Sequence, residues 1–263
     1  MNAPVREAEP RTADWPRFHT TPAKVAGELV YAIGDVHGRY DLLTEMLRRI
    51  IEDATGRLRG RTPMLILCGD YVDRGPDSAR VLTALDWIRR DGRVRLHAIK
   101  GNHEAAFLSF LADPQDGAAW LGFGGDATLV SYGVRPPADF QDVQDLVRAR
   151  DDLLEVMPAA HVRVLQGLEL MVMVGDYAFV HAGIRPGVPL ARQKPEDLLW
   201  IRGPFLDRTE RFEKRIVHGH SWIEAAPEIY NNRIGLDTGA YQTGVLTAVR
   251  IEDGEVEVFQ TNG

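Results

Sequence analysis

The sequence predicts an α/β fold, with mixed β-sheets in a two-sheet sandwich or a single mixed sheet, flanked by helices. Two observations predict it. Short apolar runs alternate with amphipathic stretches in the first half of the chain, a rhythm typical of parallel strands covered by helices. In the second half, turn dipeptides separate paired apolar runs, which is typical of antiparallel hairpins. With 263 residues, the chain can bury a sizeable core.

Three strand and helix cycles account for the first half. The predicted strands are the apolar runs 29–33, 64–67 and 94–99. A helix with one apolar face follows each strand. The first face extends from Leu42 to Ile51, the second helix opens with Pro76 in its first turn, and the third contains Phe107 to Leu111. These cycles predict a largely parallel sheet.

The alternation of strands and helices stops at residues 112–167, which contain Gly124-Gly125 and Pro136-Pro137. Within this segment a helix is predicted over Asp151–Gln166. We interpret this segment as a helical insertion or cap. Hairpins are predicted at three later turn dipeptides, namely Gly175-Asp176, Asn231-Asn232 and Asp253-Gly254. We therefore expect the second half to be antiparallel.

The start of the chain and its composition limit the kind of protein. Residues 1–27 contain four prolines and no periodic pattern, which predicts an extended or disordered leader before a single domain, 28–263. No apolar run approaches the ~20 residues that cross a bilayer, no signal-peptide core is present, and the one cysteine, Cys68, has no disulfide partner. The net charge of -7 argues against a nucleic-acid partner. We expect a cytoplasmic protein that binds no membrane.

Polar clusters follow the predicted strands. They occupy residues 34–38, 69–75, 101–104, 181–183 and 218–221. Ligands in open α/β sheets bind outside the carboxyl ends of the strands, so we expect these five loops to converge. Their Asp, His and Asn side chains are the ligands that hold divalent ions such as Mn²⁺, Fe²⁺ or Zn²⁺. A pair of ions needs a shared carboxylate, for which Asp70 is the natural candidate.

These five segments, in this order, resemble the phosphoprotein phosphatase family of calcineurin-like metallophosphoesterases, over roughly residues 30–250. The resemblance implies two divalent metal ions, with Mn²⁺ expected and Fe²⁺ or Zn²⁺ as alternatives. The first ion would be held by Asp35, His37 and Asp70, and the second by Asp70, Asn102, His181 and His220. The family pattern places the last ligand at His220, and His218 is interpreted as a packed neighbour.

The same resemblance assigns the catalytic roles. His103 would be the proton donor, Asp73 would orient it, and Arg74 would bind the phosphoryl group. Arg202, after the short segment 197–200, resembles a second phosphate-binding arginine. The implied mechanism is direct attack on phosphorus by a hydroxide that bridges the two ions, without a phosphoenzyme.

Some assignments have two interpretations from sequence alone. Glu104 could hydrogen-bond the site or cap the following helix, and Gly124-Gly125 could approach substrate or form a plain turn. The aromatic residues Trp120, Phe123, Trp200 and Trp222 could line a substrate groove or belong to the core. Cys68, on a buried strand, is expected to be a structural thiol.

The leading functional hypothesis is a protein serine/threonine phosphatase, with tolerance for phosphotyrosine or small phosphate esters. The alternative enzyme is a bis(5'-nucleosyl)-tetraphosphatase, which hydrolyses diadenosine tetraphosphate and resembles the same motif set. Asp73 with Arg74, and Glu104 after His103, favour the phosphatase. A non-catalytic binding module is disfavoured because every metal and acid position is filled, and a nuclease because the chain offers no basic track.

Overall fold

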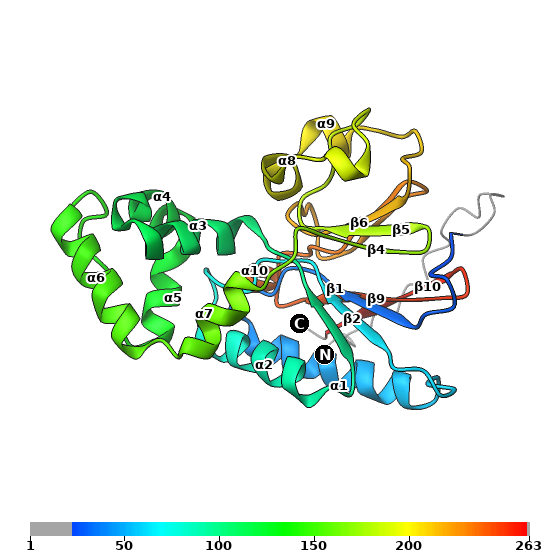
Figure 1. Cartoon of the computed structure of the whole chain (residues 1–263), viewed down its shortest axis with the longest axis horizontal. Coiled ribbons are helices and arrows are strands. Elements are labelled where there is room, and N and C mark those ends of the chain that lie inside the picture. Colours follow the sequence, from blue (N-terminus) through cyan, green and yellow to red (C-terminus); the bar gives the residue numbers. More distant parts are fainter. Residues whose placement is uncertain (1–22, 262–263) are drawn as a thin grey trace, which may run out of the picture.

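Two five-stranded sheets form the centre of the computed structural model, which describes residues 23–261 (Figure 1). The first sheet has the order β10-β9-β1-β2-β3. Its strands are β1 Val30–Ile33, β2 Met64–Leu67, β3 Arg95–Ala98, β9 Thr247–Glu252 and β10 Glu255–Gln260. β1, β2 and β3 are parallel, and the β9–β10 hairpin adds to β1 in antiparallel orientation. The predicted parallel half is confirmed.

The second sheet has the order β4-β5-β6-β8-β7. Its strands are β4 Met171–Val174, β5 Tyr177–Val180, β6 Arg215–His218, β7 Glu228–Ile229 and β8 Arg233–Gly235. All three predicted hairpins are present, as the antiparallel pairs β4–β5, β7–β8 and β9–β10. However, β5–β6 and β6–β8 are parallel, so the expectation of a fully antiparallel second half is wrong. The connection of residues 181–214 is long enough to return the chain to the same end of the sheet before β6 begins.

The two sheets pack face to face. The apolar layer between them includes Ala32 and Ile66 from the first sheet and Phe179 and Val217 from the second, all fully buried. Sheet faces with alternating apolar side chains pack in this way because each buries the hydrocarbon surface of the other. The predicted two-sheet sandwich is confirmed.

Two long helices, α1 Tyr40–Thr55 and α2 Ser78–Asp91, cover the outer face of the first sheet, and α3 Asn102–Ala112 extends from the edge of the sheet to one side (Figure 1). Their apolar faces, with Leu43, Leu82 and Phe107, bury against Ile33 and Leu67. The predicted opening of the second helix by Pro76 is wrong by two residues. The backbone is left-handed at Asp73 and Arg74, so the chain leaves this tight turn before the helix can begin at Ser78.

Further helices continue from α3 to one side of the sheets (Figure 1). They are the 3₁₀ turn Pro114–Asp116, α4 Gly117–Trp120, the π-helical turn Leu121–Gly125, α5 Asp126–Ser131, α6 Val143–Val156 and α7 Ala159–Gln166. The single helix predicted over Asp151–Gln166 is therefore wrong. Pro158 lacks an N–H and restricts the residue before it, so α6 ends at Val156 and a new helix begins after the proline.

The segment 184–214 covers the outer face of the second sheet. It contains the 3₁₀ turn Leu190–Arg192, α8 Pro195–Trp200 and α9 Gly203–Leu206, which lie above β5 and β6 in Figure 1. Leu198 and Phe205 pack there against Val180 and Ile216. The last helix, α10 Ala240–Thr243, precedes β9.

Most of the expected leader, residues 1–22, lies outside the described residues. From Ala23 the chain follows the β4–β5 turn, where Lys24 and Asp176 exchange two hydrogen bonds of 2.9 and 2.7 Å. Val25 is fully buried in the layer between the sheets. Among the described residues, every helix is too short or too polar to span a membrane.

Candidate active site

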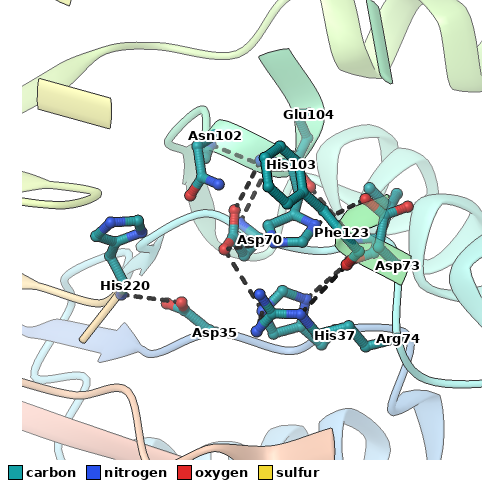
Figure 2. A network of polar contacts seen from close by, with 12 residues as sticks. Asp35, His37, Asp70, Asp73, Arg74, Asn102, His103, Glu104, Phe123 and His220 are labelled. Atoms are coloured by element: carbon teal, nitrogen blue, oxygen red, sulfur yellow. Dashed lines mark hydrogen bonds and ion pairs between the residues drawn. The ribbon is translucent and has the colours of Figure 1, made fainter. Parts of the chain in front are cut away.

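Five loops bring the predicted metal ligands together at one edge of the sandwich. Asp35 and His37 follow β1, and Asp70 follows β2. Asn102 comes shortly after Ile99, the residue next to β3 that forms a β-bridge with Glu169. His181 follows β5, and His220 follows β6. Each of the six is at most 7% exposed. Carboxyl ends of parallel strands meet at the same edge, which explains why motifs so far apart in sequence converge. Figure 2 shows Asp70 at the centre of this group.

Asp70 lies between two sets of histidines. Its Oδ2 is 3.4 Å from His37 Nε2 and 3.8 Å from His103 Nε2, whereas its Oδ1 is 3.5 Å from His181 Nε2. Two groups suited to metal ions share it: His37, Asp70 and His103, and Asp70, His181 and His220, with ligand atoms within 4.8 Å of one another. The site therefore has the donor geometry of a dinuclear metal centre with one bridging carboxylate.

The histidines present lone pairs to the centre of each group. His181 Nδ1 donates to Cys68 O at 2.8 Å, so its Nε2 carries the lone pair. That Nε2 lies 2.8 Å from Asn102 Oδ1 and 3.2 Å from His220 Nδ1, which are atom types that can bind a metal ion. Such crowding of lone pairs is favourable when a cation lies between them. The second ring nitrogen, bonded to a backbone carbonyl, is the usual support for a ligating histidine.

Asp35 supplies an independent test of the fit. Its Oδ2 accepts the backbone N–H of His220 at 2.9 Å, but its Oδ1 is buried without a partner among the described residues. A Cβ on Gly219 would lie only 1.8 Å from this oxygen, so the carboxylate needs the glycine beside it. Burial, together with Asp237 and Asp70, raises the pKa of Asp35 well above its usual range. A divalent cation is the ligand that satisfies such a group. Asp35 lies outside the group of His37, Asp70 and His103 but belongs to the same buried network.

The loops that carry these residues are strained. Five site residues have left-handed backbone conformations, namely His37 (φ 43°), Asp70 (φ 50°), Asp73 (φ 71°), Arg74 (φ 68°) and His220 (φ 65°). Each costs on the order of 1–3 kcal/mol for a residue other than glycine. Such conformations persist only where the surroundings hold them, and they cluster at functional sites.

Glu104 holds the loop that carries Asp70. Its carboxylate accepts backbone N–H groups of Asp70 (2.9 Å), Tyr71 (2.7 Å) and Val72 (3.2 Å), and of Gly101 at 2.9 Å. Both interpretations from sequence are therefore correct, because the bond to Gly101 caps α3 and the other three shape the metal-binding loop. Glu104 is fully buried and positions Asp70 through its backbone.

His103 forms a dyad with Asp73. His103 Nδ1 lies 2.7 Å from Asp73 Oδ2, and its Nε2 faces the centre of the site. Burial lowers the pKa of His103, but the charges of Asp70 and Asp73 outweigh it and hold the pKa above the usual value. The dyad thus favours the protonated imidazole that a general acid requires.

The helices after α3 hold the other side of this dyad. Trp120 Nε1 donates to Asp73 Oδ2 at 3.0 Å, and Thr128 Oγ1 donates to Asp73 Oδ1 at 2.6 Å. Trp120 is itself stacked between Phe107 and Phe110 at 4.9 and 4.7 Å. From the sequence, Trp120 could line a substrate groove or belong to the core. The structure places it in the core, with its N–H directed at Asp73. Thr128 was missed, because no local motif connects it to Asp73.

Two arginines lie on opposite sides of the site. Arg74 Nη1 is 3.2 Å from His37 Nε2, and its guanidinium lies 4.8 Å from the ring centroid of Tyr241. Arg202 Nη1 donates to Ser221 Oγ at 3.1 Å, next to His220. Both arginines are exposed, so their guanidinium groups remain accessible to a ligand above the buried carboxylates.

Two further titratable residues, His218 and Asp237, are buried next to the site. His218 is buried against Phe205 and outside the two metal-binding groups, as a packed neighbour should be. Asp237 was not predicted, yet it lies within hydrogen-bonding reach of Asp35, and burial raises its pKa to about 6. It follows β8 in the same way as the other acidic residues follow their strands, so the same signal could have found it.

Comparisons with known proteins agree with this geometry. The model of the calcineurin-like phosphoesterase family matches residues 29–241. The Serine/threonine-protein phosphatase 1 of Salmonella typhimurium is 34% identical, over 85% of this chain and 92% of that protein. The symmetrical bis(5'-nucleosyl)-tetraphosphatase of Nitrosospira multiformis is 27% identical, over 88% of this chain and 95% of that protein. A crystal structure of a proposed diadenosine tetraphosphatase superposes with a TM-score of 0.60 at 19% identity, covering 92% of this chain and all of that one. The relatives therefore carry both names between which the sequence left a choice.

Substituting Trp120 tests whether the helices after α3 support the dyad. Trp120→Phe keeps an aromatic ring between Phe107 and Phe110 but removes the N–H that Asp73 accepts. We expect a loss of about 1–3 kcal/mol in the free energy of unfolding, because a buried carboxylate loses a donor. The measurement is chemical denaturation, with Trp87→Phe on the exposed face of α2 as the matched control. A loss no larger than that of the control would contradict the assignment.

Substituting Asp35 tests the metal fit through stability. In the wild-type protein, Mn²⁺ at a hundred times its Kd should add about 2.7 kcal/mol per site, and chelation should remove it. Asp35→Asn removes a buried carboxyl group whose ionisation is opposed by burial and by Asp237 and Asp70, so we expect a higher melting temperature without metal and a smaller response to Mn²⁺. Asp253→Asn, in the exposed β9–β10 turn, serves as the control and should respond like wild type. A full Mn²⁺ response in Asp35→Asn would count against its role as a ligand.

Proposed function

Because the chain belongs to the calcineurin-like phosphoesterase family, we propose that it is a metal-dependent phosphomonoesterase that hydrolyses phosphoserine and phosphothreonine in proteins. Membership of this family makes the chain a phosphoesterase, and the two donor groups that share Asp70 are suited to two metal ions. The choice of phosphoprotein as substrate is our proposal and rests on the acid dyad of His103 and Asp73.

We assign the ligands as the sequence predicted. Asp35, His37 and Asp70 would hold one ion, and Asp70, Asn102, His181 and His220 the other. Bound divalent ions, for which we propose Mn²⁺, would activate water and neutralise charge on the phosphoryl oxygens. Glu104 and the backbone bonds of the histidine rings keep these ligands in place before substrate arrives.

The arginines would orient the phosphoryl group. Arg74 and Arg202 reach it from opposite sides, and a guanidinium fork can donate two parallel hydrogen bonds to phosphoryl oxygens as their charge grows. Direct attack by water agrees with the state of Cys68, because burial raises the pKa of its thiol and its side chain is fully buried. This cysteine is therefore unsuited to form a phosphoenzyme.

The dyad carries the choice of substrate. When the bond between phosphorus and a serine oxygen breaks, the leaving alkoxide is strongly basic and needs a proton, which His103 Nε2 can supply. Asp73, held by Trp120 and Thr128, keeps the imidazole oriented and protonated. A leaving group that ends in phosphate is stable as an anion and gains much less from such an acid. A buried, fully hydrogen-bonded acid dyad is therefore better explained by an alcohol leaving group.

The second candidate is hydrolysis of a dinucleoside tetraphosphate. It is favoured by the relative of Nitrosospira multiformis, which bears that name and matches nearly the whole chain. Assays of a phosphoserine peptide and diadenosine tetraphosphate under identical conditions separate the two functions. We expect the larger kcat/KM for the peptide, and turnover of the dinucleotide alone would overturn the proposal.

Replacing His103 tests its role as the acid. His103→Asn should lower kcat on a phosphoserine peptide by about 10²–10⁴-fold, because the basic leaving group loses its proton donor. The loss on p-nitrophenyl phosphate should be far smaller, since nitrophenolate is a stable anion. The unchanged Mn²⁺ content of the variant is the control for the metal site. Equal losses on both substrates would remove the acid role from His103.

The pH dependence tests the dyad directly. The acid must be protonated, so kcat/KM on the phosphoserine peptide should fall as pH rises through the pKa of His103, which the charges of Asp70 and Asp73 raise above the usual range of a histidine despite burial. Asp73→Asn removes a charge that raises this pKa, and the fall should then move to lower pH. Steady-state kinetics across the pH range measures the shift. An alkaline limb at the same pH in both proteins would show that another group titrates.

A further inference from the structure

We infer that Phe123 and Trp200 form an aromatic wall on the leaving-group side of the site and select against leaving groups that carry negative charge. The inference deepens the proposed function and rests on it. The wall joins two segments that are far apart in sequence, the helices after α3 and the 184–214 segment. Its members contact the site through two histidines on opposite sides of Asp70.

Phe123 lies beside the proton donor. Its ring centroid is 6.0 Å from that of His103, in an edge arrangement, and Figure 2 places it next to His103 and Arg74. The π-helical turn Leu121–Gly125 that carries it is fixed against the site. Gly124 O accepts the backbone N–H of Arg74 at 3.0 Å, and a Cβ on Gly124, where φ is 96°, would lie 3.0 Å from Arg74 Cγ. The irregular turn thus sets the position of the Phe123 ring.

Trp200 lies on the other side. It ends α8, and its ring centroid is 6.2 Å from that of His220. Leu198 O accepts the backbone N–H of Ala182 at 2.8 Å, which ties α8 to the loop of His181. The centroids of Phe123 and Trp200 are 5.7 Å apart, so the two segments meet in an aromatic contact beside the metal ligands.

Both rings remain available to a ligand. Phe123 is 39% exposed and Trp200 43%, whereas the histidines that they contact are at most 7% exposed. Large apolar side chains exposed beside a buried polar site cost hydration free energy unless a ligand covers them. Since the Phe123 ring lies beside the ring of His103, which we propose as the proton donor, the group that it would cover is the one that leaves with that proton.

The chemistry of the leaving group decides what fits this wall. In a phosphoserine peptide, the bond between phosphorus and oxygen breaks, water supplies the new oxygen on phosphorus, and the leaving oxygen takes a proton to become an alcohol. This product is uncharged and carries hydrocarbon that can pack on the two rings. In a dinucleoside tetraphosphate, the leaving oxygen belongs to another phosphate, which keeps its negative charge. Of the two rings, Trp200 carries an N–H, but Phe123, the ring beside His103, offers this charge no hydrogen-bond donor. The wall therefore favours peptide over polyphosphate.

The experiment introduces a positively charged side chain into the aromatic wall and measures the ratio of kcat/KM for two substrates. We would determine kcat/KM for a phosphoserine peptide and for diadenosine tetraphosphate in wild type, Phe123→Arg, Trp200→Arg and Phe123→Leu. The ratio of peptide to dinucleotide should fall by about tenfold or more in each arginine variant, because a charge-assisted hydrogen bond becomes available to the anion. Phe123→Leu keeps the wall apolar and should retain most of the preference.

Val130→Arg is the matched control, because it adds the same charge to an exposed position of α5. Its ratio should equal that of wild type, which excludes an effect of net charge. An unchanged ratio in both arginine variants, or an equal change in Val130→Arg, would overturn the wall. If an arginine variant fails to fold, a loss of preference in Phe123→Leu as large as that expected for arginine also contradicts the inference. A wild-type enzyme that prefers the dinucleotide contradicts the proposed function instead, so the two failures are distinguishable.

Discussion

The rest of the site depends on one buried carboxylate, that of Asp70. Its two oxygens face histidines on opposite sides. Asp70 is only 2% exposed, so water does not solvate its charge. Burial raises the pKa of Asp70, but four surrounding histidines outweigh burial and lower it below the usual range. Glu104 holds the backbone of Asp70 in a left-handed conformation that would otherwise be unfavourable. We interpret Asp70 as a preformed carboxylate bridge for two cations, which the fold maintains at a cost in its free energy of unfolding.

The fold explains why such a bridge can exist. Parallel pairing of β1, β2 and β3 places three loops at one edge, and face-to-face packing brings the ends of β5 and β6 to the same edge from the second sheet. The helices after α3 then add what neither sheet supplies, the two donors from Trp120 and Thr128 that fix Asp73. The residues that we propose as metal ligands thus come from the sandwich, while the surroundings of the proposed acid, His103, come largely from the helical segment.

The sequence predicted those features of the fold and the site that are determined by neighbouring residues. The strands, the three hairpins and the polar clusters each occupy a few adjacent residues, and the family resemblance joined the clusters into one site. Prediction from sequence failed where contacts between distant residues determine the structure. Thr128 donates to Asp73 across 55 positions, and the parallel pairing of β5 with β6 depends on how residues 181–214 return the chain. The split at Pro158 was visible in the sequence, since proline interrupts helical hydrogen bonding, but the apolar period continues across it. The contact of Phe123 with Trp200 follows only from tertiary structure.

We propose that Asp70 joins the two metal-binding groups into one centre. Calorimetric titration of the metal-stripped protein with Mn²⁺ measures the number of ions bound to each chain and thereby tests this role of Asp70. We expect two ions for wild type and a loss of tight binding at both positions in Asp70→Asn, because both groups use that carboxylate. Two tightly bound ions in Asp70→Asn, or a single ion in wild type, would contradict the shared bridge.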